Sequence, residues 1–359
     1  MKIGIYDPYL DDLGGGEKYM MTIAQVLSGS HDVSVFWDNN SDVNELLKRF
    51  SLDLTKVKIV NNIFSGKIGF LEKIKQSSKY DAIIFLSDGS IPFTLAKKLF
   101  LHLQQPLVHI NPNSLKNKIK LSRVTAIFCN SKFTLSFNEK RLSGVKSLVV
   151  YPPVTINKKE VKKEKIVLHV GRFRVRNVDL SDYKKQNVMI DVFKQMVDKK
   201  MIKDWKFILA VSFKKEDEER FSLLRNAAKG YPITFFVNKS NDELWDIYNK
   251  AKIYWHASGF GEDLEKHPEY AEHFGISTVE AMGAGCVPVV INSGGQREIV
   301  TDKENGFLWN SIDELQDITE KLMQDNALWS KISAKAKTRS NDFSYDQFRK
   351  QILQLVENK

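Results

Sequence analysis

Short, continuous apolar runs alternate along the chain with longer stretches in which apolar residues recur every three or four positions. The short runs predict buried strands, and the longer stretches predict amphipathic helices that cover them. In the first half we expect strands at 2–6, 33–37, 57–60, 82–86, 99–103, 126–129 and 148–151, and helices at 17–27, 43–50 and 132–138. Strands that are apolar on both faces and separated by helices pair in parallel.

Pro152 and Pro153 interrupt this alternation, and a charged stretch without an apolar face follows. A second series then predicts strands at 166–170, 206–211, 233–237, 253–256 and 287–291, and closing helices at 312–323, 328–339 and 345–356. We therefore expect an α/β protein with two Rossmann-like, doubly wound domains. Their predicted extents are 1–153 and 166–341, with a linker at 154–165 and a C-terminal helix, about 342–359, that packs back on the first domain. In such sheets ligands bind at the carboxyl ends of the strands, here in a central cleft.

Composition narrows the choice of partners. The chain of 359 residues carries a formal net charge of +10, which suits an anionic ligand or an acidic membrane face; no nucleic-acid-binding motif is present. Cys129 and Cys286 each adjoin an apolar run, which is typical of buried thiols in a reducing compartment. The first residues turn polar too early for a signal peptide. These features predict a cytoplasmic protein.

A glycine loop, Gly14–Gly16, follows the first strand and opens a helix. Gly15 and Gly16 let the backbone approach a phosphate beside the free N–H groups of the helix. A dinucleotide site is disfavoured, because Tyr19 stands where its third glycine belongs, although Asp38 imitates the ribose-binding acid of such a site.

The most informative segment contains Glu272 and Glu280, separated by seven residues. A helix that begins near Gly275 would offer the N–H groups of Gly275, Ile276 and Ser277 to a diphosphate. A carboxylate beside that site can accept hydrogen bonds from two sugar hydroxyls.

This segment resembles the E-x7-E signature of glycosyltransferase family 4 (group 1), the retaining nucleotide-sugar transferases with the GT-B fold. The resemblance extends over essentially the whole chain. It implies that the first domain takes the acceptor and the second the nucleotide sugar. It also implies that Glu280 binds the ribose of the donor, that Glu272 faces the transferred sugar, and that no metal or other cofactor takes part.

The same resemblance assigns the cations that neutralise the donor diphosphate. Arg172 follows a buried strand in the Gly171-Arg172 turn, and Lys185 matches the downstream lysine of the family. The intervening loop, 174–183, is longer than the family requires, so Lys184 is an alternative to Lys185. The family also carries a Gly-Gly turn like that at 294–295, which would pack closely beside the donor.

Family members often place a histidine of the first domain against the donor sugar. His102, at the end of a predicted strand, is favoured for this role over His109, and His256 of the second domain ranks lower. The alternative for His102 is a structural residue whose hydrogen bonds are satisfied in the core.

Two further stretches are candidates for acceptor binding. Residues 61–75 mix apolar side chains with lysines, so they either lie on an anionic bilayer or pack as a helix against the first domain. The insertion 259–271 either shapes the acceptor or sugar pocket or is a solvated loop.

The predicted reaction moves a hexose from a nucleoside diphosphate to a hydroxyl of a glycan or lipid-linked acceptor, with retention. The form Glu272–Ile276 resembles mannosyltransferases that act on lipid-linked oligosaccharides, which favours GDP-mannose over a UDP-sugar. The protein would act in the cytoplasm or peripherally at the inner membrane face. The alternatives are a nucleotide-sugar epimerase, a non-catalytic nucleotide-sugar-binding protein and, least favoured, an NAD oxidoreductase.

Overall fold

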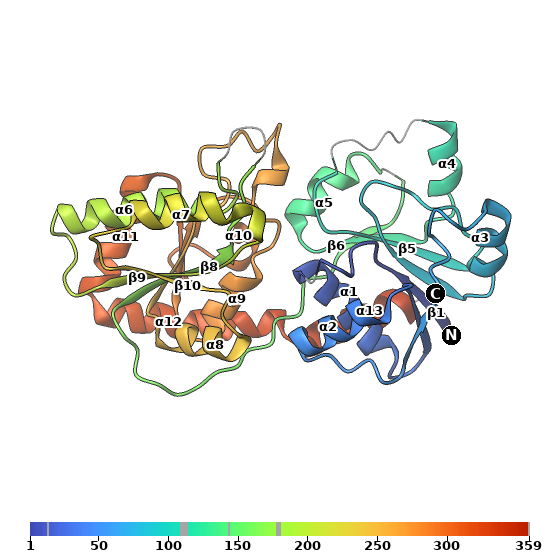
Figure 1. The fold of residues 1–359 in the computed structure, drawn as a ribbon, viewed down its shortest axis with the longest axis horizontal. Coiled ribbons are helices and arrows are strands. Elements are labelled where there is room, and N and C mark those ends of the chain that lie inside the picture. Colours follow the sequence, from blue (N-terminus) through green and yellow to red (C-terminus); the bar gives the residue numbers. More distant parts are fainter. Residues whose placement is uncertain (13, 108–113, 143, 177–180, 358–359) are drawn as a thin grey trace. The chain divides into compact units, whose positions relative to one another are not determined.

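A computed structural model describes the chain except for residues 13, 108–113, 143, 177–180 and 358–359 (Figure 1). It divides into two compact units. The first comprises Met1–Pro153 and Tyr345–Lys359, and the second comprises Val154–Ser344. His109, the less favoured histidine of the first half, lies outside the described residues.

The first unit is built on a parallel sheet with the order β3-β2-β1-β4-β5-β6-β7. Its strands are β1 Lys2–Tyr6, β2 Asp32–Phe36, β3 Val57–Val60, β4 Ala82–Leu86, β5 Lys98–Leu103, β6 Ala126–Cys129 and β7 Ser147–Val149. Its helices are α1 Gly15–Leu27, α2 Asn40–Phe50, α3 Phe70–Ser77, α4 Leu115–Leu121, α5 Lys132–Glu139 and α13 Tyr345–Glu357. All seven predicted strands are confirmed, and the last one ends two residues earlier than expected.

Helices cover both faces of this sheet. α1, α2 and α13 lie on one face, where Phe348, Ile352 and Val356 of α13 join the apolar core (Figure 1). α3, α4 and α5 lie on the other face. Burial of both faces explains why the strands read as continuous apolar runs.

The second unit repeats the plan, with the parallel order β10-β9-β8-β11-β12-β13. Its strands are β8 Ile166–Arg172, β9 Lys206–Ser212, β10 Ile233–Val237, β11 Ile253–His256, β12 Val287–Ile291 and β13 Phe307–Trp309. Its helices are α6 Gln186–Asp198, α7 Glu218–Ala227, α8 Asn241–Lys250, α9 Ile276–Gly283, α10 Gln296–Ile299, α11 Ile312–Gln324 and α12 Asn326–Ser340, with 3-10 turns at 215–217, 268–270 and 341–343. The strand β13 was not predicted.

Both sheets have the doubly wound order, in which successive strands are added first on one side of the first strand and then on its other side. This change of side falls between β1 and β4 in the first unit and between β8 and β11 in the second. Loops that leave the carboxyl ends of these strands diverge there, which is where such sheets bind ligands. The predicted α/β architecture is confirmed.

Residues 154–165 group with the second unit. Lys163 anchors this stretch, because its amino group donates to the carbonyl oxygens of Ala251 at 2.8 Å and Ala284 at 2.7 Å. In the part of the chain that the structure describes, no helix combines the length and the apolar character needed to cross a membrane.

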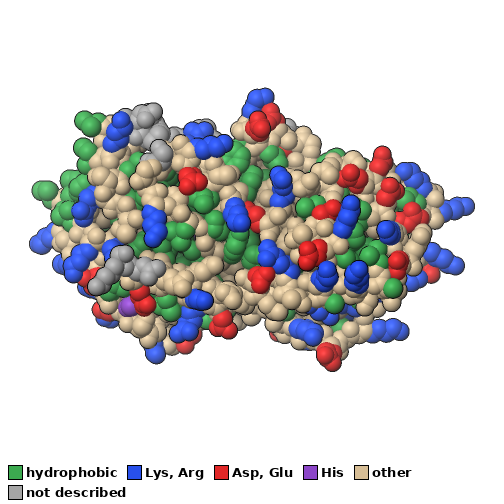
Figure 2. Space-filling view, turned by 180° about the vertical axis from the view of Figure 1, so that it is seen from behind, with side chains coloured by type: hydrophobic (Ala, Val, Ile, Leu, Met, Phe, Trp, Pro, Cys, Tyr) green, Lys and Arg blue, Asp and Glu red, His purple; other side chains and the backbone are tan. Residues whose placement is uncertain are grey.

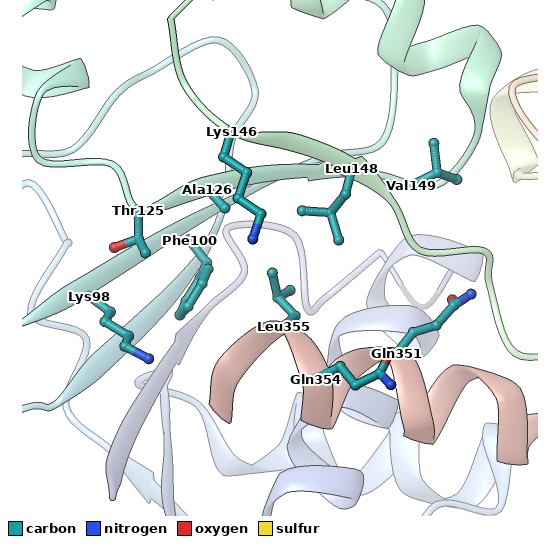
Figure 3. A pocket seen from close by; sticks show the side chains of 10 residues that line it. All are labelled: Lys98, Phe100, Thr125, Ala126, Lys146, Leu148, Val149, Gln351, Gln354 and Leu355. Carbon is teal, nitrogen blue, oxygen red and sulfur yellow. The ribbon is translucent and has the colours of Figure 1, made fainter. Parts of the chain in front are cut away.

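A groove of about 480 Å³ opens in the first unit between the sheet and α13 (Figure 3). Lys98, Thr125 and Lys146 line it, and they lie at or just before the amino ends of β5, β6 and β7. In Figure 3, Lys146 and Leu148 point toward Leu355 of α13. The groove therefore lies at the opposite end of the strands from the carboxyl edge at which doubly wound sheets bind ligands.

Candidate active site

The carboxyl ends of β8 and β11 define the candidate site of the second unit. These strands are paired neighbours, and β8 ends at Arg172 while β11 ends at His256. The helices α6 and α9 begin at Gln186 and Ile276, beyond the loops on this edge. Parallel strands thus bring residues from four distant parts of the sequence to one edge.

Lys184, His256 and Glu272 form a cluster at this edge. The Lys184 Nζ lies 2.6 Å from Glu272 Oε2, and the His256 Nε2 lies 3.0 Å from the same oxygen. Burial raises the pKa of Glu272, but the Lys184 ammonium and the hydrogen bond from His256 outweigh it and hold that pKa well below its usual range. Glu272 is therefore ionised and can only accept hydrogen bonds.

His256 is neutral in this cluster. Its side chain is almost fully buried, and burial lowers its pKa although Glu272 acts in the opposite direction. A neutral imidazole that donates from Nε2 to Glu272 leaves Nδ1 as an acceptor. Within the described residues no partner contacts that Nδ1.

Lys185, predicted to contact the diphosphate, is engaged elsewhere. Its amino group pairs with the carboxylate of Glu262, from the insertion 259–271. Arg176 binds the same carboxylate in bidentate fashion, at 2.9 Å and 3.0 Å, and its guanidinium lies 4.1 Å from the ring centroid of Tyr270. The insertion is thus tied to the loop before α6.

Gly171 explains how Lys184 reaches the strand end. A Cβ atom at this position would lie 3.0 Å from His169 Nε2 and 3.5 Å from the Cγ of Lys184. A side chain there would crowd both residues. The glycine therefore leaves space for Lys184 beside the carboxyl end of β8.

Gly275 precedes α9 in the left-handed region, with φ of 119°, and a Cβ there would lie 2.7 Å from Gln296 Nε2. The helix begins at the next residue, as predicted. Among the described groups, none accepts a hydrogen bond from the N–H of Ile276 or Ser277, which matches the expected free helix terminus. The Ser277 hydroxyl lies 2.7 Å from the Tyr254 hydroxyl.

Glu280 lies within α9, more than one turn from its start. The hydroxyl of Tyr248 donates to Glu280 Oε2 at 2.9 Å. Tyr248 is fully buried, so its hydroxyl holds the carboxylate in a fixed position. Sequence patterns do not reveal this support, because Tyr248 lies on α8, 32 residues from Glu280.

The turn at 293–295 packs against the segment that carries Glu272. The Gly295 N–H donates to the Glu272 carbonyl at 2.7 Å, and a Cβ on Gly294 would lie 2.4 Å from that carbonyl oxygen. The predicted close backbone packing of these glycines is thus present. It holds Glu272 next to the start of α9.

Arg172 is the last residue of β8 and is partly exposed. Among the described side chains, no acid forms an ion pair with it. Its guanidinium is therefore available to an anion at the same edge as the Lys184 cluster.

In the first unit, the predicted glycines lie at the start of α1. Gly15 and Gly16 open the helix, and the Gly14 N–H donates to the Glu17 carboxylate at 2.5 Å. A Cβ on Gly16 would lie 2.2 Å from Gln104 Oε1, so this backbone is in tight contact with the residue after β5.

His102 is buried within the first unit. Its ring stacks between Tyr19, at 4.3 Å, and Phe128, at 4.5 Å between centroids, and its Nδ1 lies 3.0 Å from the Phe128 carbonyl oxygen. Burial lowers its pKa to about 3, so the ring is neutral. The role of His102 at the donor sugar stays a prediction.

Asp7 was missed by the sequence analysis. It follows β1 directly and is fully buried; its Oδ1 accepts from the Tyr9 N–H at 2.9 Å. Burial, and secondarily the charge of Glu17, raises its pKa to about 8. An acid immediately after a buried strand and before a glycine loop was the signal that could have revealed it.

Two observations define the class of protein. Each unit is a doubly wound α/β layer structure, and the second carries cations, an ionised glutamate and a helix N-terminus at one edge. The pattern of the family described as "Glycosyl transferases group 1" matches residues 155–339, more than half of the chain. The chain belongs to this family, which confirms the resemblance drawn from the glutamate spacing.

Relatives are similar over different extents. A Campylobacter jejuni protein, GalNAc-alpha-(1->4)-GalNAc-alpha-(1->3)-diNAcBac-PP-undecaprenol alpha-1,4-N-acetyl-D-galactosaminyltransferase, is 25% identical over 369 residues, 96% of this chain and 95% of its own. The Dictyostelium discoideum GDP-Man:Man(3)GlcNAc(2)-PP-Dol alpha-1,2-mannosyltransferase is 26% identical over 231 residues, 60% of this chain. That match spans only 43% of the Dictyostelium protein.

Solved structures agree in fold. Anabaena Alr3699/HepE in complex with UDP superposes with a TM-score of 0.74 at 18% identity, over 100% of both chains. The sucrose-phosphate synthase of Thermosynechococcus elongatus gives a TM-score of 0.69 at 15% identity, over 99% of this chain and 98% of that one. At these identities the likeness establishes the fold, which is that of GT-B glycosyltransferases.

Proposed function

We propose that the protein transfers a hexose or N-acetylhexosamine from a nucleoside-diphosphate sugar to a hydroxyl of a lipid-linked glycan. The observation that carries the proposal is the convergence of Arg172, Lys184 and Glu272 beside the start of α9. The family and the lipid-linked acceptors named for its Campylobacter and Dictyostelium relatives support the acceptor class.

The cations and the helix terminus stabilise the leaving diphosphate. Negative charge builds on its oxygens as the glycosidic bond breaks, and fixed positive groups at that place lower the barrier. Arg172 and the N–H groups of Ile276 and Ser277 suit this role. Lys184 is favoured over Lys185 as the third contact, because it lies beside Gly171 and Glu272, whereas Lys185 is held by Glu262.

The two glutamates hold the sugars on either side of the diphosphate. Glu272 is ionised and accepts hydroxyl protons of the transferred sugar, and Glu280 accepts from the ribose.

The reaction retains the anomeric configuration. The acceptor oxygen attacks from the face that the diphosphate leaves; the bond from the anomeric carbon to the diphosphate oxygen breaks as the new glycosidic bond forms. The departing diphosphate oxygen takes the acceptor's proton. No protein nucleophile, metal or other cofactor is needed for this balance of atoms.

Two donors have specific support. GDP-mannose is favoured by the names of the mannosyltransferase relatives, and a UDP-sugar is favoured by the UDP complex of the Anabaena neighbour and by the Campylobacter relative, whose name specifies N-acetylgalactosamine. We place the protein at the cytoplasmic membrane face, where it would meet a lipid-linked acceptor.

A thermal-shift panel of nucleotide sugars tests the donor. At 100 times its dissociation constant, the true donor adds about 2.7 kcal/mol to the free energy of unfolding, which raises the melting temperature clearly. The shift should disappear in Arg172→Ala. If no GDP- or UDP-sugar stabilises the protein, the proposed donor class is wrong.

A further inference from the structure

Exposed apolar side chains are concentrated on three segments of the first unit: α3, the stretch 91–97 and α4. Of the nine large hydrophobic side chains that are exposed in the described part of the chain, five lie there. Their exposed fractions are 62% for Phe70, 81% for Leu71, 44% for Leu95, 75% for Leu115 and 52% for Ile119. Folding in water does not account for apolar side chains gathered at the surface in this way.

Direct contacts join the three segments into one surface. The rings of Phe70 and Phe93 lie 6.1 Å apart, which ties α3 to the stretch 91–97. On the other side, Lys120 of α4 donates to the Ile91 carbonyl at 2.5 Å, and Arg123 donates to the Ala96 carbonyl at 3.2 Å. We call this region the basic apolar surface.

The two helices contribute little to the core beneath them. α3 fully buries only Ser77, and α4 fully buries no side chain. Leu115 and Ile119 are four residues apart and therefore lie on the same side of α4. By contrast, Phe64, earlier in the same predicted segment, packs into the core with Phe36 and Phe85. The packing expected for residues 61–75 thus holds for Phe64 but not for Phe70 and Leu71.

The same surface carries charge of one sign. Residues 67–79 and 115–123 contain seven lysines and one arginine against a single acid, Glu72. Figure 2 shows hydrophobic side chains standing among Lys and Arg side chains at the outer edge of the first unit, on the left of that view. Apolar side chains set among cations match a bilayer interface, where the apolar groups enter the lipid and the cations meet phosphates.

We propose that the basic apolar surface docks on the anionic face of a lipid bilayer. Phe70, Leu71, Leu115 and Ile119 enter the boundary between headgroups and acyl chains, and the lysines of α3 and α4 lie against the lipid phosphates. This inference extends the proposed function, because a lipid-linked acceptor must be reached at a membrane. A bilayer is favoured over a protein partner because the charge excess is large and of one sign and because the apolar side chains are interspersed with lysines.

Flotation of the full-length protein with vesicles tests the proposal. The protein should float with phosphatidylcholine vesicles that contain phosphatidylglycerol and not with pure phosphatidylcholine, and high salt should weaken the binding. The double variant Leu71→Ser, Leu115→Ser should bind at least about ten-fold more weakly. Lys116→Glu with Lys118→Glu should have a similar effect.

The second unit supplies matched controls. The apolar control is Leu223→Ser, at a residue of α7 that is 56% exposed. The charge control is Lys203→Glu with Lys229→Glu, at two exposed lysines. Both controls should bind vesicles as wild type does. All variants should keep the wild-type melting temperature and its shift with nucleotide sugar, so that loss of docking is separated from loss of fold or of donor binding.

Three results would overturn the proposal: no binding of wild type to anionic vesicles, equal weakening by the Leu223 control, or a dimer in solution that the Leu71 and Leu115 changes abolish without any vesicle binding. The flotation experiment does not depend on sugar transfer. If the proposed reaction is wrong, the flotation result therefore still tests the docking proposal.

Discussion

The Lys184 ammonium and the Glu272 carboxylate lie 2.6 Å apart at the carboxyl edge of the second sheet, although 88 residues separate them in the sequence. His256 contacts the same carboxylate oxygen at 3.0 Å. In the proposed reaction, Lys184 would meet the anionic leaving group and Glu272 would accept a hydrogen bond from a sugar hydroxyl. Their contact also favours Lys184, which the sequence analysis gave only as the alternative to Lys185.

Replacing each lysine separately tests this distinction. Lys184→Ala should lower kcat at least about 100-fold, because it removes a fixed positive charge from the leaving diphosphate. Lys185→Ala should cost much less, since Glu262 already engages that amino group. Steady-state kinetics with saturating donor measures both effects. The control is Lys165→Ala, which replaces an exposed lysine directly before β8. A larger loss in Lys185→Ala than in Lys184→Ala would reverse the assignment.

The Glu262 carboxylate should matter for stability. Glu262→Ala removes the carboxylate that the Arg176 guanidinium, only 7% exposed, binds in bidentate fashion. The substitution should lower the free energy of unfolding by about 2 to 3 kcal/mol. Urea unfolding followed by tryptophan fluorescence measures the change. Lys266→Ala breaks an exposed pair with Asp263 in the same insertion and should leave stability unchanged. Equal losses in the two variants would show that the buried pair stabilises the fold no more than the exposed pair does.

Asp7 should make stability depend on pH. Its pKa is raised from about 3.8 to about 8, so between these values the folded protein holds a proton that the unfolded chain releases. Stability therefore falls as pH rises through this window, by at most about 1.4 kcal/mol per pH unit. Asp7→Asn removes this slope, and its stability relative to wild type should increase from pH 5 to pH 8.

Urea unfolding at the two pH values measures the difference. Asp11→Asn, in the exposed part of the following loop, should keep the wild-type slope. A constant difference between Asp7→Asn and wild type across the window would mean that Asp7 is ionised in the folded state.

The strands were predictable because both of their faces are buried. Each strand is therefore a short, continuous apolar run, which is typical of a buried strand. β13 was not predicted, because Phe307–Trp309 is too short to show a hydrophobic pattern. α4 escaped because Leu115 and Ile119 alternate with lysines and are not buried. An exposed helix of this kind lacks the apolar face on which sequence patterns depend.

The site was predictable only where chemistry is local. Arg172 directly after a strand, and Glu272 and Glu280 around a glycine-bounded helix, are visible in the sequence. Two partners are not visible in the sequence, because only the fold brings them together. Glu262 lies 86 residues from Arg176, and Tyr248 lies 32 residues from Glu280. The start of α6 could not be fixed across the loop 174–183, and this is why Lys184 and Lys185 could not be separated.

The central claim is tested most directly by a transfer assay with the full-length protein, GDP-mannose or UDP-sugars, and polyprenyl-diphosphate-linked glycans. The account predicts that one donor extends the glycan by a single sugar in the α configuration, that nucleoside diphosphate is released only when acceptor is present, and that EDTA leaves the rate unchanged. Arg172→Ala and Glu272→Gln should abolish the product. Conversion of the donor to an isomeric sugar without any extended glycan would contradict the account and favour an epimerase.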